Sequence, residues 1–199
     1  MNQFIKTKKL VLREPNLKDS EKVANLYKIN FPEHILVKRG ILSNPEKMKE
    51  EFQKENKRWL IAELDKKIVG CSAVEFSEWN SAAEIERVVV AKNMRNNGIA
   101  KKMCKALIDK IAKPEGVKYV FAHARGPQYG MQKVLKDLDF KAVGIMPVFY
   151  VNHEGREIRE NFVYMCRFLN GGENEIESED NLIPEAKSIK DIIEKQYNN

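Results

Sequence analysis

Residues Arg95–Ala100 combine a cation, a glycine and the expected start of a helix, which together suit an anion-binding turn. The β-branched run Ile85–Val90 comes before them and predicts a buried strand. Apolar residues then recur at helical spacing from Ile99 to Ile111 and predict a helix. The first turn of a helix offers unpaired backbone N–H groups and the positive end of the helix dipole. We therefore expect this turn to bind a phosphate or pyrophosphate; a tight turn without a ligand is the alternative.

Two carboxylates lie just upstream of that turn. Glu84 and Glu86 are two residues apart on the same expected strand, so both side chains point to one face. A lysine-type amine with a pKa of ~10.4 is neutral only about once in 2,500 molecules at pH 7. A carboxylate that removes its proton makes the nitrogen a nucleophile. We expect one of the pair to act as a general base, with Glu84 favoured; the alternative is an ion pair at the strand surface.

The elements that must position these residues follow a mixed α/β order. The segment 31–43 shows no regular pattern, and the turn at residues 153–156 joins the last two expected strands. In chain order we expect a strand at 10–14, helices at 20–29 and 45–56, strands at 59–64, 68–76 and 83–90, a helix at 99–111, a strand at 117–124, a helix at 129–138, and strands at 141–151 and 161–168.

Size and composition indicate one globular domain. The chain has 199 residues, of which 43% are hydrophobic and 32% charged. No apolar run approaches the ~20 residues that span a membrane, and residues 1–6 show no signal-peptide pattern. Cys71, Cys104 and Cys166 are unclustered, so we expect neither a disulfide framework nor a metal site. A reducing, cytoplasmic location is the expectation.

Charge is unevenly distributed along the chain. The net charge is +6, yet the segment from residue 171 onward is acidic. The basic remainder lacks interleaved aromatic residues, so it suits a multiply phosphorylated cofactor better than nucleic acid. Residues 170–182 resemble a linker, and Ile189, Ile192 and Ile193 then share one face of an expected helix. We expect that helix to dock on its own domain rather than on a partner.

The pattern Arg95-x-x-Gly98-x-Ala100 resembles the pyrophosphate-binding motif of the GCN5-related N-acetyltransferases, Arg/Gln-x-x-Gly-x-Gly/Ala. The order of expected elements also matches that fold over roughly residues 8–169. The resemblance implies an α/β fold with a mixed, mostly antiparallel central sheet that splays between its fourth and fifth strands and is flanked by helices. It further implies an acetyltransferase domain at 1–169, and the composition of the remaining chain predicts an acidic linker and amphipathic helix at 170–199.

The resemblance also implies a binding path for acetyl-CoA, with the pyrophosphate at the turn and the pantetheine arm between the splayed strands. A backbone N–H near Val88–Val90, where the strand bulges, would polarise the thioester. Glu84 matches the general base of the histone-acetylating branch, and Glu86 matches that of many small-molecule members. The implied cofactor-binding residues are Val88, Val89, Val90, Arg95, Asn96, Asn97, Gly98, Ile99, Ala100, Lys101 and Gln128.

The tyrosine that usually protonates the leaving thiolate in this family is missing from the chain. Family members usually carry a tyrosine in the helix after the fifth strand, where this chain has Leu135, which cannot protonate a leaving thiolate. Tyr129, in the first turn of that helix, is the substitute we expect, ahead of Tyr150 and Tyr164. The alternative is that water or the attacking amine supplies the proton.

The acceptor is suggested by residues 124–132, which resemble a stretch of the β-lysine N-acetyltransferase branch. We expect Arg125 to bind a substrate carboxylate; a surface contact or a CoA phosphate is the alternative. His34 lies in a loop where acceptors bind in this fold, whereas His123, in a strand, is expected to be structural.

These observations predict an acetyl-CoA-dependent N-acetyltransferase that acts on a small amine or amino acid. A protein lysine or N-terminus is the alternative acceptor, and an open groove between residues 31–43 and 147–157 would favour it. A non-catalytic acyl-CoA-binding module is the alternative from a different class. A small-molecule amine is the expected partner, neither nucleic acid nor a membrane is expected, and a homodimer is left open.

Overall fold

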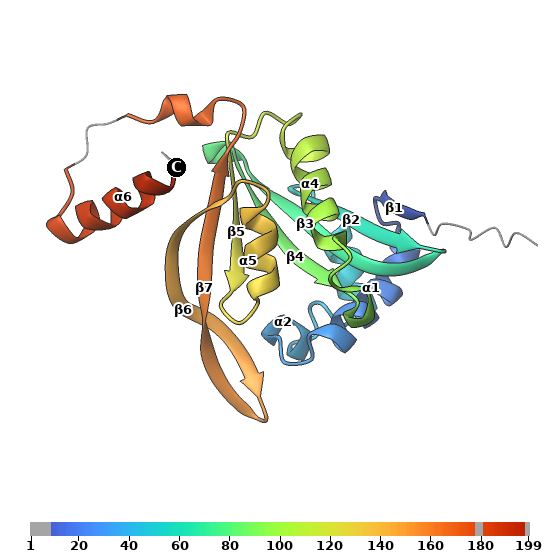
Figure 1. The fold of residues 1–199 in the computed structure, drawn as a ribbon. Coiled ribbons are helices and arrows are strands. Elements are labelled where there is room, and N and C mark those ends of the chain that lie inside the picture. Colours follow the sequence, from blue (N-terminus) through green and yellow to red (C-terminus); the bar gives the residue numbers. More distant parts are fainter. Residues whose placement is uncertain (1–8, 178–180, 198–199) are drawn as a thin grey trace, which may run out of the picture.

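The computed structural model describes residues 9–177 and 181–197, which form one sheet with helices on both faces (Figure 1). The strands are β1 (Leu10–Arg13), β2 (Lys57–Leu64), β3 (Lys67–Ser77), β4 (Ala82–Val90), β5 (Tyr119–Arg125), β6 (Lys141–His153) and β7 (Arg156–Phe168). The helices are α1 (Ser20–Asn30), α2 (Ile35–Lys38), α3 (Pro45–Phe52), α4 (Ile99–Leu107), α5 (Tyr129–Lys136) and α6 (Pro184–Tyr197).

The central sheet splays between β4 and β5, as predicted. The strand order is β1-β2-β3-β4-β5-β7-β6, and neighbouring strands are antiparallel except for the parallel pair β4–β5. That pair is joined only from Ala82 to Glu84, opposite Tyr119 to Phe121. Beyond Glu84 the two strands separate, which leaves room between them for a ligand.

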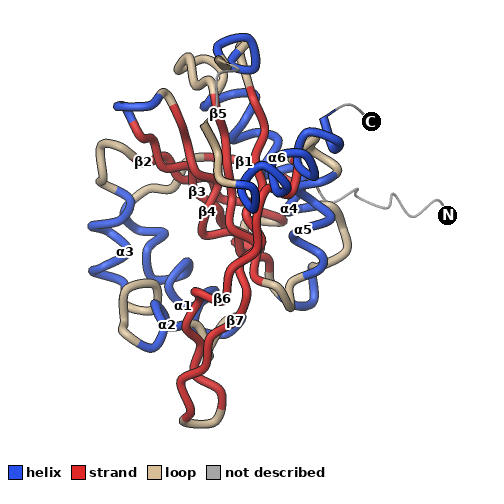
Figure 2. The backbone as a smooth tube through the Cα atoms, turned by 90° about the vertical axis from the view of Figure 1, so that its left-hand side faces the viewer, coloured by secondary structure: helices blue, strands red, loops and turns tan. Residues whose placement is uncertain are grey.

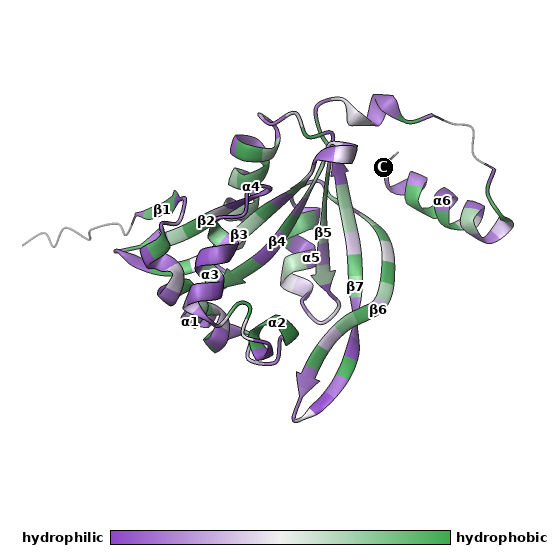
Figure 3. Cartoon of the chain, turned by 180° about the vertical axis from the view of Figure 1, so that it is seen from behind, coloured by the Kyte–Doolittle hydropathy of each residue, from purple (hydrophilic) through white to green (hydrophobic). Residues whose placement is uncertain are grey.

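Two hydrophobic cores hold the helices against the sheet. The helices α4 and α5 cover one face, where Met103, Leu107 and Leu135 are fully buried. The helices α1 and α3 cover part of the other face, where Val23 and Met48 are fully buried (Figure 2). On this second face, no helix of the described chain crosses β5 and β7 (Figure 3), and the β5 residues Phe121, His123 and Arg125 are only half-buried.

Most predicted elements are confirmed, with shifted ends. The helix α3 stops at Phe52 instead of residue 56, because a turn follows in which the Lys57 N–H donates to the Lys54 carbonyl. Residues 31–43, expected to be irregular, contain the short helix α2. The helix α4 stops at Leu107 and continues as a π-helical turn over Ile108–Ala112.

The last hairpin is longer than the sequence predicts. The strands β6 and β7 span 13 residues each, and β7 begins at Arg156 instead of residue 161. The added segment of β7 is charged and largely exposed, so it lacks the alternation of polar and apolar residues that marks a half-buried strand. In Figure 1 this arm of the hairpin extends beyond the rest of the sheet, towards α2.

The C-terminal helix α6 contacts its own domain at β6, where the Gln196 side-chain amide donates to the Ala142 carbonyl at 2.7 Å. Ile189 and Ile192 stay exposed, by 56% and 64%. Their side chains therefore do not pack into the domain core. Within the described part of the chain, no helix combines the length and the apolar character that crossing a membrane requires.

Candidate active site

A bulge interrupts β4 beside the splay. Glu86 pairs with Ala73 and Val89 pairs with Cys71, so two β4 residues between them oppose the single residue Ser72. The first of the two, Arg87, has a φ of +56°, a left-handed conformation that is costly for a residue with a Cβ. The Tyr27 hydroxyl donates to the Arg87 carbonyl and holds it in place. The predicted bulge is thus present, but it begins one residue earlier than expected.

The turn before α4 has the open geometry of an anion site. Gly98 has a φ of +71°, and a Cβ built there would have no atom within 4 Å, so nothing covers this point of the turn. Asn97 shapes the turn from inside, because its amide donates to the carbonyls of Met94 and Arg95. Arg95 donates from Nε to the Val90 carbonyl at 3.2 Å, which anchors its side chain at the end of β4. The backbone of the first turn of α4 is therefore accessible to an anion.

A cavity of about 210 Å³, here called the turn cavity, leads away from Gly98 between β4 and α5. Most residues expected to bind the cofactor line it. They are Val88, Val90, Arg95, Asn96, Gly98, Ile99, Ala100, Lys101 and Gln128. Val89 differs, because it is buried in the core beneath α1. Asn97 acts through the turn it shapes and is absent from the lining.

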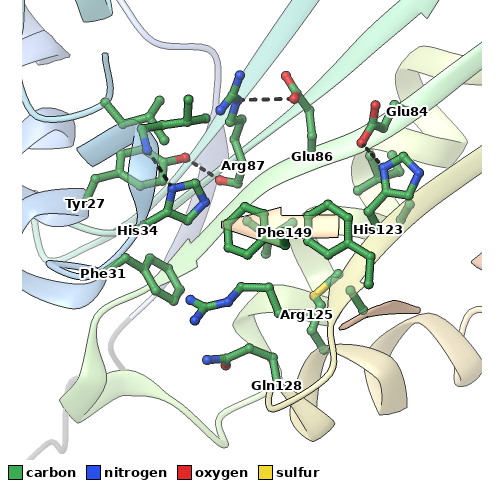
Figure 4. A pocket seen from close by; sticks show the side chains of 18 residues that line it. Tyr27, Phe31, His34, Glu84, Glu86, Arg87, His123, Arg125, Gln128 and Phe149 are labelled. Atoms are coloured by element: carbon green, nitrogen blue, oxygen red, sulfur yellow. Dashed lines mark hydrogen bonds and ion pairs between the residues drawn. The ribbon is translucent and has the colours of Figure 1, made fainter. Parts of the chain in front are cut away.

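A second cavity of about 370 Å³, here called the strand cavity, lies where β4 and β5 part (Figure 4). It adjoins the turn cavity, because Val88, Gln128 and Met131 line both. Glu84 and Glu86 also line it, as their spacing on one face of β4 predicts. The two cavities thus form a continuous path from the turn before α4 to the two carboxylates.

Glu84 is paired with a histidine across the splay. Its Oε1 lies 2.8 Å from Nδ1 of His123, and both side chains are partly exposed to the strand cavity. The sequence assigned His123 only a structural role, so this pair was missed. The parallel register that sets Glu84 opposite Phe121, and hence near His123, depends on tertiary structure.

Glu86 belongs instead to a buried ion cluster. Lys57, whose side chain is 1% exposed, contacts one oxygen of Glu86 and lies 2.7 Å from Glu75 and 3.3 Å from Glu51. Arg87 Nε lies 3.2 Å from the other Glu86 oxygen. Burial raises the pKa of Glu86, while Arg87 and Lys57 oppose the increase. Both of its oxygens are engaged by cations, whereas the partner of Glu84 is an imidazole.

Arg125, expected to bind a substrate carboxylate, already contacts two protein carboxylates. Its Nε lies 2.8 Å from Glu160 and its Nη1 lies 3.2 Å from Glu33, and its side chain is 10% exposed. Its guanidinium lies 5.2 Å from the centre of the Phe149 ring. Arg125 therefore ties β5 to the loop before α2 and to β7, and its partners are protein carboxylates where the sequence predicted a substrate carboxylate.

The loop before α2 and the last hairpin are joined at one end of the strand cavity. His34 forms a bridge with Val151, and the Asn152 N–H donates to the Glu33 carbonyl at 3.0 Å. The His34 ring meets the Phe149 ring edge-on at 4.8 Å. These contacts close the gap between residues 31–43 and 147–157 that an open groove would need.

His34 lines the strand cavity, where the sequence placed an acceptor-binding residue. Burial, and after it the nearby charge of Arg125, lowers the pKa of His34 to about 4, so the ring is neutral at pH 7. Its Nδ1 accepts a hydrogen bond from the Leu36 N–H, which leaves the proton on Nε2.

The tyrosines are placed differently from the sequence expectation. Tyr129 is 74% exposed on α5 and does not belong to the lining of either cavity. Leu135, at the usual tyrosine position, is fully buried. Tyr27 does line the strand cavity, but its hydroxyl is bonded to the β4 bulge. In the sequence, nothing distinguishes Tyr27 from an ordinary core residue of a helix.

Comparisons with known proteins agree on one fold. The sequence model described as the acetyltransferase (GNAT) family matches residues 21–140. No curated protein matches the chain in sequence. Among solved structures, a GNAT-family acetyltransferase from Streptococcus pneumoniae has a TM-score of 0.67 at 21% identity, covering 81% of this chain and 100% of that chain.

Two further structures show the range of proteins with this fold. The protein yncA from Salmonella typhimurium, solved with its cofactor acetyl-CoA, has a TM-score of 0.68 at 17% identity, covering 87% of this chain and 99% of that chain. A ribosomal-protein-alanine N-acetyltransferase from Brucella melitensis has a TM-score of 0.63 at 18% identity, covering 80% of this chain and 99% of that chain. At such identities the similarity establishes the fold alone, so the choice of acceptor must be argued from the site.

Proposed function

The chain belongs to the acetyltransferase (GNAT) family, and from this premise we propose that it transfers the acetyl group of acetyl-CoA to the primary amine of a small molecule. That it is an N-acetyltransferase with acetyl-CoA as its acyl donor follows from the family. The small acceptor rests on one observation, the junction of His34 with Val151 and Phe149, which closes one end of the strand cavity. A polypeptide acceptor would need an open groove at that place.

The turn before α4 fits the pyrophosphate of coenzyme A. Gly98 leaves the turn uncovered, and the helix dipole favours negative charge there. Lys101 adds a cation beside it, although its Nζ also lies 3.2 Å from Asp137 at the surface. The turn cavity then offers an apolar path past Val88 and Met131 for the pantetheine arm. Acetyl-CoA supplies an activated thioester at the far end of this path, close to the β4 bulge.

Glu84 is the general base in this proposal, and His123 is its positioning residue. The acceptor enters as an ammonium ion and loses a proton to Glu84, and its nitrogen then forms the amide bond as the thioester carbon–sulfur bond breaks. With its proton on Nδ1, His123 donates to the Glu84 carboxylate and fixes its orientation. Glu86 is the second candidate base, but Lys57 and Arg87 hold its two oxygens.

Leu135 stands where family members usually carry a proton-donating tyrosine, so the leaving thiolate must receive its proton from another source. Tyr129 lies outside both cavities, so we assign the proton to water or to the acceptor nitrogen. We assign residues 1–169 to the catalytic domain and residues 170–199 to a tail whose helix α6 packs on β6.

The test is to incubate the protein with acetyl-CoA and a panel of small amines, peptides and proteins, and to follow thiol release. Fast release with a small amine and slow release with every peptide supports the proposal. Preferential release with a peptide would overturn the small acceptor. Tight acetyl-CoA binding without release on any amine would indicate a non-catalytic binding module.

A further inference from the structure

We infer that the acceptor is a primary amine with an apolar body and no carboxylate, and that Glu33 and Glu160 exclude amino acids by occupying Arg125. This inference rests on the proposed function, because it concerns the acceptor of that same site. It replaces the amino-acid acceptor that the sequence left open.

The first step is the charge at Arg125. One guanidinium lies between the carboxylates of Glu33 and Glu160, at 3.2 and 2.8 Å, so the group of three carries a net charge of −1 when ionised. Arg125 and Glu160 are each 10% exposed, so water screens their charges poorly. A substrate carboxylate arriving here would meet net repulsion and would have to displace a protein carboxylate. Repulsion of this kind discriminates against a substrate without adding contacts to the preferred one.

The second step is the remaining charge of the strand cavity. The lysine and arginine side chains in its described lining are Arg87 and Arg125. Arg87 lies 3.2 Å from Glu86, which Lys57 also contacts. Glu84, by contrast, is paired with an imidazole. The cavity therefore offers a carboxylate to an incoming ammonium group, whereas its arginines already contact protein carboxylates.

The third step is the aromatic wall. The rings of His34, Phe149, Phe162 and His123 follow one another, with centroids 4.8, 4.6 and 5.4 Å apart. This row runs from the closed end of the cavity to the partner of Glu84. His34 adds no charge at pH 7, because burial lowers its pKa to about 4. An apolar acceptor body can lie along this wall while its amine reaches Glu84.

The experiment compares matched pairs of acceptors that differ only in a carboxylate, such as phenethylamine and phenylalanine, or pentylamine and norleucine. The full-length protein is assayed by thiol release with saturating acetyl-CoA. We expect kcat/KM to favour each amine over its amino acid by about 100-fold, since a carboxylate buried beside like charges, with no cation free to pair with it, is strongly disfavoured. We also expect phenethylamine to exceed ethanolamine about 10-fold.

Equal or higher kcat/KM for the amino acids would overturn this inference and leave the small-amine function standing. Equal kcat/KM values for ethanolamine and phenethylamine would overturn the inference that the acceptor has an apolar body. Turnover on peptides alone would overturn the proposed function, and this inference with it.

Two variants test the cause. In Glu33→Gln and Glu160→Gln, Arg125 loses one of its two carboxylate partners, so the preference for the amine should shrink about 10-fold, mainly through a lower KM for the amino acid. Glu157→Gln is the matched control, because Glu157 is an exposed residue of β7. An unchanged preference in both folded variants would show that Arg125 does not set the selectivity. If one of the two variants fails to fold, the amine preference of the other variant still tests the role of Arg125.

Discussion

Glu84 Oε1 lies 2.8 Å from His123 Nδ1, and the two residues stand on parallel strands that part immediately beyond Glu84. The pair therefore sits at the apex of the splay, at the edge of the strand cavity. Its place explains why two residues 39 apart in the chain can work as one unit. The pairing with an imidazole also distinguishes Glu84 from Glu86, which forms an ion pair with the buried Lys57.

Glu84→Gln should lower kcat by about 100- to 10,000-fold at pH 7, because the amide cannot accept the proton of the acceptor ammonium. The rate should recover partly at alkaline pH, where more of the acceptor is already neutral. The measurement is a pH–rate profile with saturating acetyl-CoA. Glu78→Gln, outside the lining of the strand cavity, is the control. A profile that matches the wild type would remove Glu84 from the mechanism.

His123→Gln should lower kcat less than Glu84→Gln does, by about 10-fold, because it disturbs the orientation of the base and leaves the base in place. A positioning role predicts that Glu84→Gln and the double variant have nearly the same rate, since the orientation of a missing base no longer matters. Additive losses in this double-mutant cycle would instead assign His123 a role independent of Glu84.

Gly98→Glu should weaken acetyl-CoA binding at least about 100-fold, because it puts bulk and negative charge where the phosphates are expected. Titration calorimetry measures the affinity. Gly116→Glu is a matched control, since Gly116 has a φ of +73° and, like Gly98, no atom within 4 Å of an added Cβ. Both variants carry similar backbone strain, of about 1–2 kcal/mol. Equal affinities would mean that the turn does not bind the cofactor.

Lys57→Met should reduce the free energy of unfolding by about 3–5 kcal/mol, because it leaves the carboxylates of Glu51, Glu75 and Glu86 without their shared buried cation. Lys57→Arg should lose less, since it keeps the charge. Urea denaturation at pH 7 gives the values. Lys47→Met is the control, because its pair with Glu50 is exposed and such pairs contribute about 0–1 kcal/mol. If Lys57→Met and Lys47→Met reduce the free energy of unfolding equally, the buried ion cluster around Lys57 does not stabilise the fold more than an exposed ion pair does.

His34→Asn should change the pH dependence of stability. The pKa of His34 is lowered to about 4 in the folded protein, mainly by burial, while an unfolded histidine titrates near ~6.5. The unfolded state therefore binds the additional proton first as the pH falls. The wild type should lose stability relative to His34→Asn between about pH 6.5 and 4, by up to about 3 kcal/mol.

Asparagine is the suitable replacement because position 34 is the N-cap of α2, and asparagine also caps helices well. Chemical denaturation of both proteins at pH 7 and pH 4.5 gives the double difference, in which the titration of other groups cancels. A difference that stays constant with pH would contradict a buried, neutral His34.

The sequence determined those parts of the site that depend on neighbours along the chain. The turn at Arg95–Ala100 follows from a glycine before a helix start, and the shared face of Glu84 and Glu86 follows from the two-residue repeat of a strand. The order of strands and helices followed from hydrophobic periodicity, whereas the splayed sheet was implied by the resemblance of that order and of the turn motif to a known family. Element ends were less predictable, as the exposed, charged start of β7 shows.

Only the tertiary structure determines which side chains form ion pairs across the site. Arg125 meets Glu33, 92 residues away in the chain, and Glu160, 35 residues away. No local pattern encodes such distances, because they depend on strand register and on how loops close over the sheet. Side-chain type showed that Arg125 could bind a carboxylate, but packing determined that protein carboxylates occupy it. The sequence alone therefore predicted the turn before α4 with its glycine, whereas the contacts of Arg125, on which the proposed acceptor rests, arise only in the folded chain.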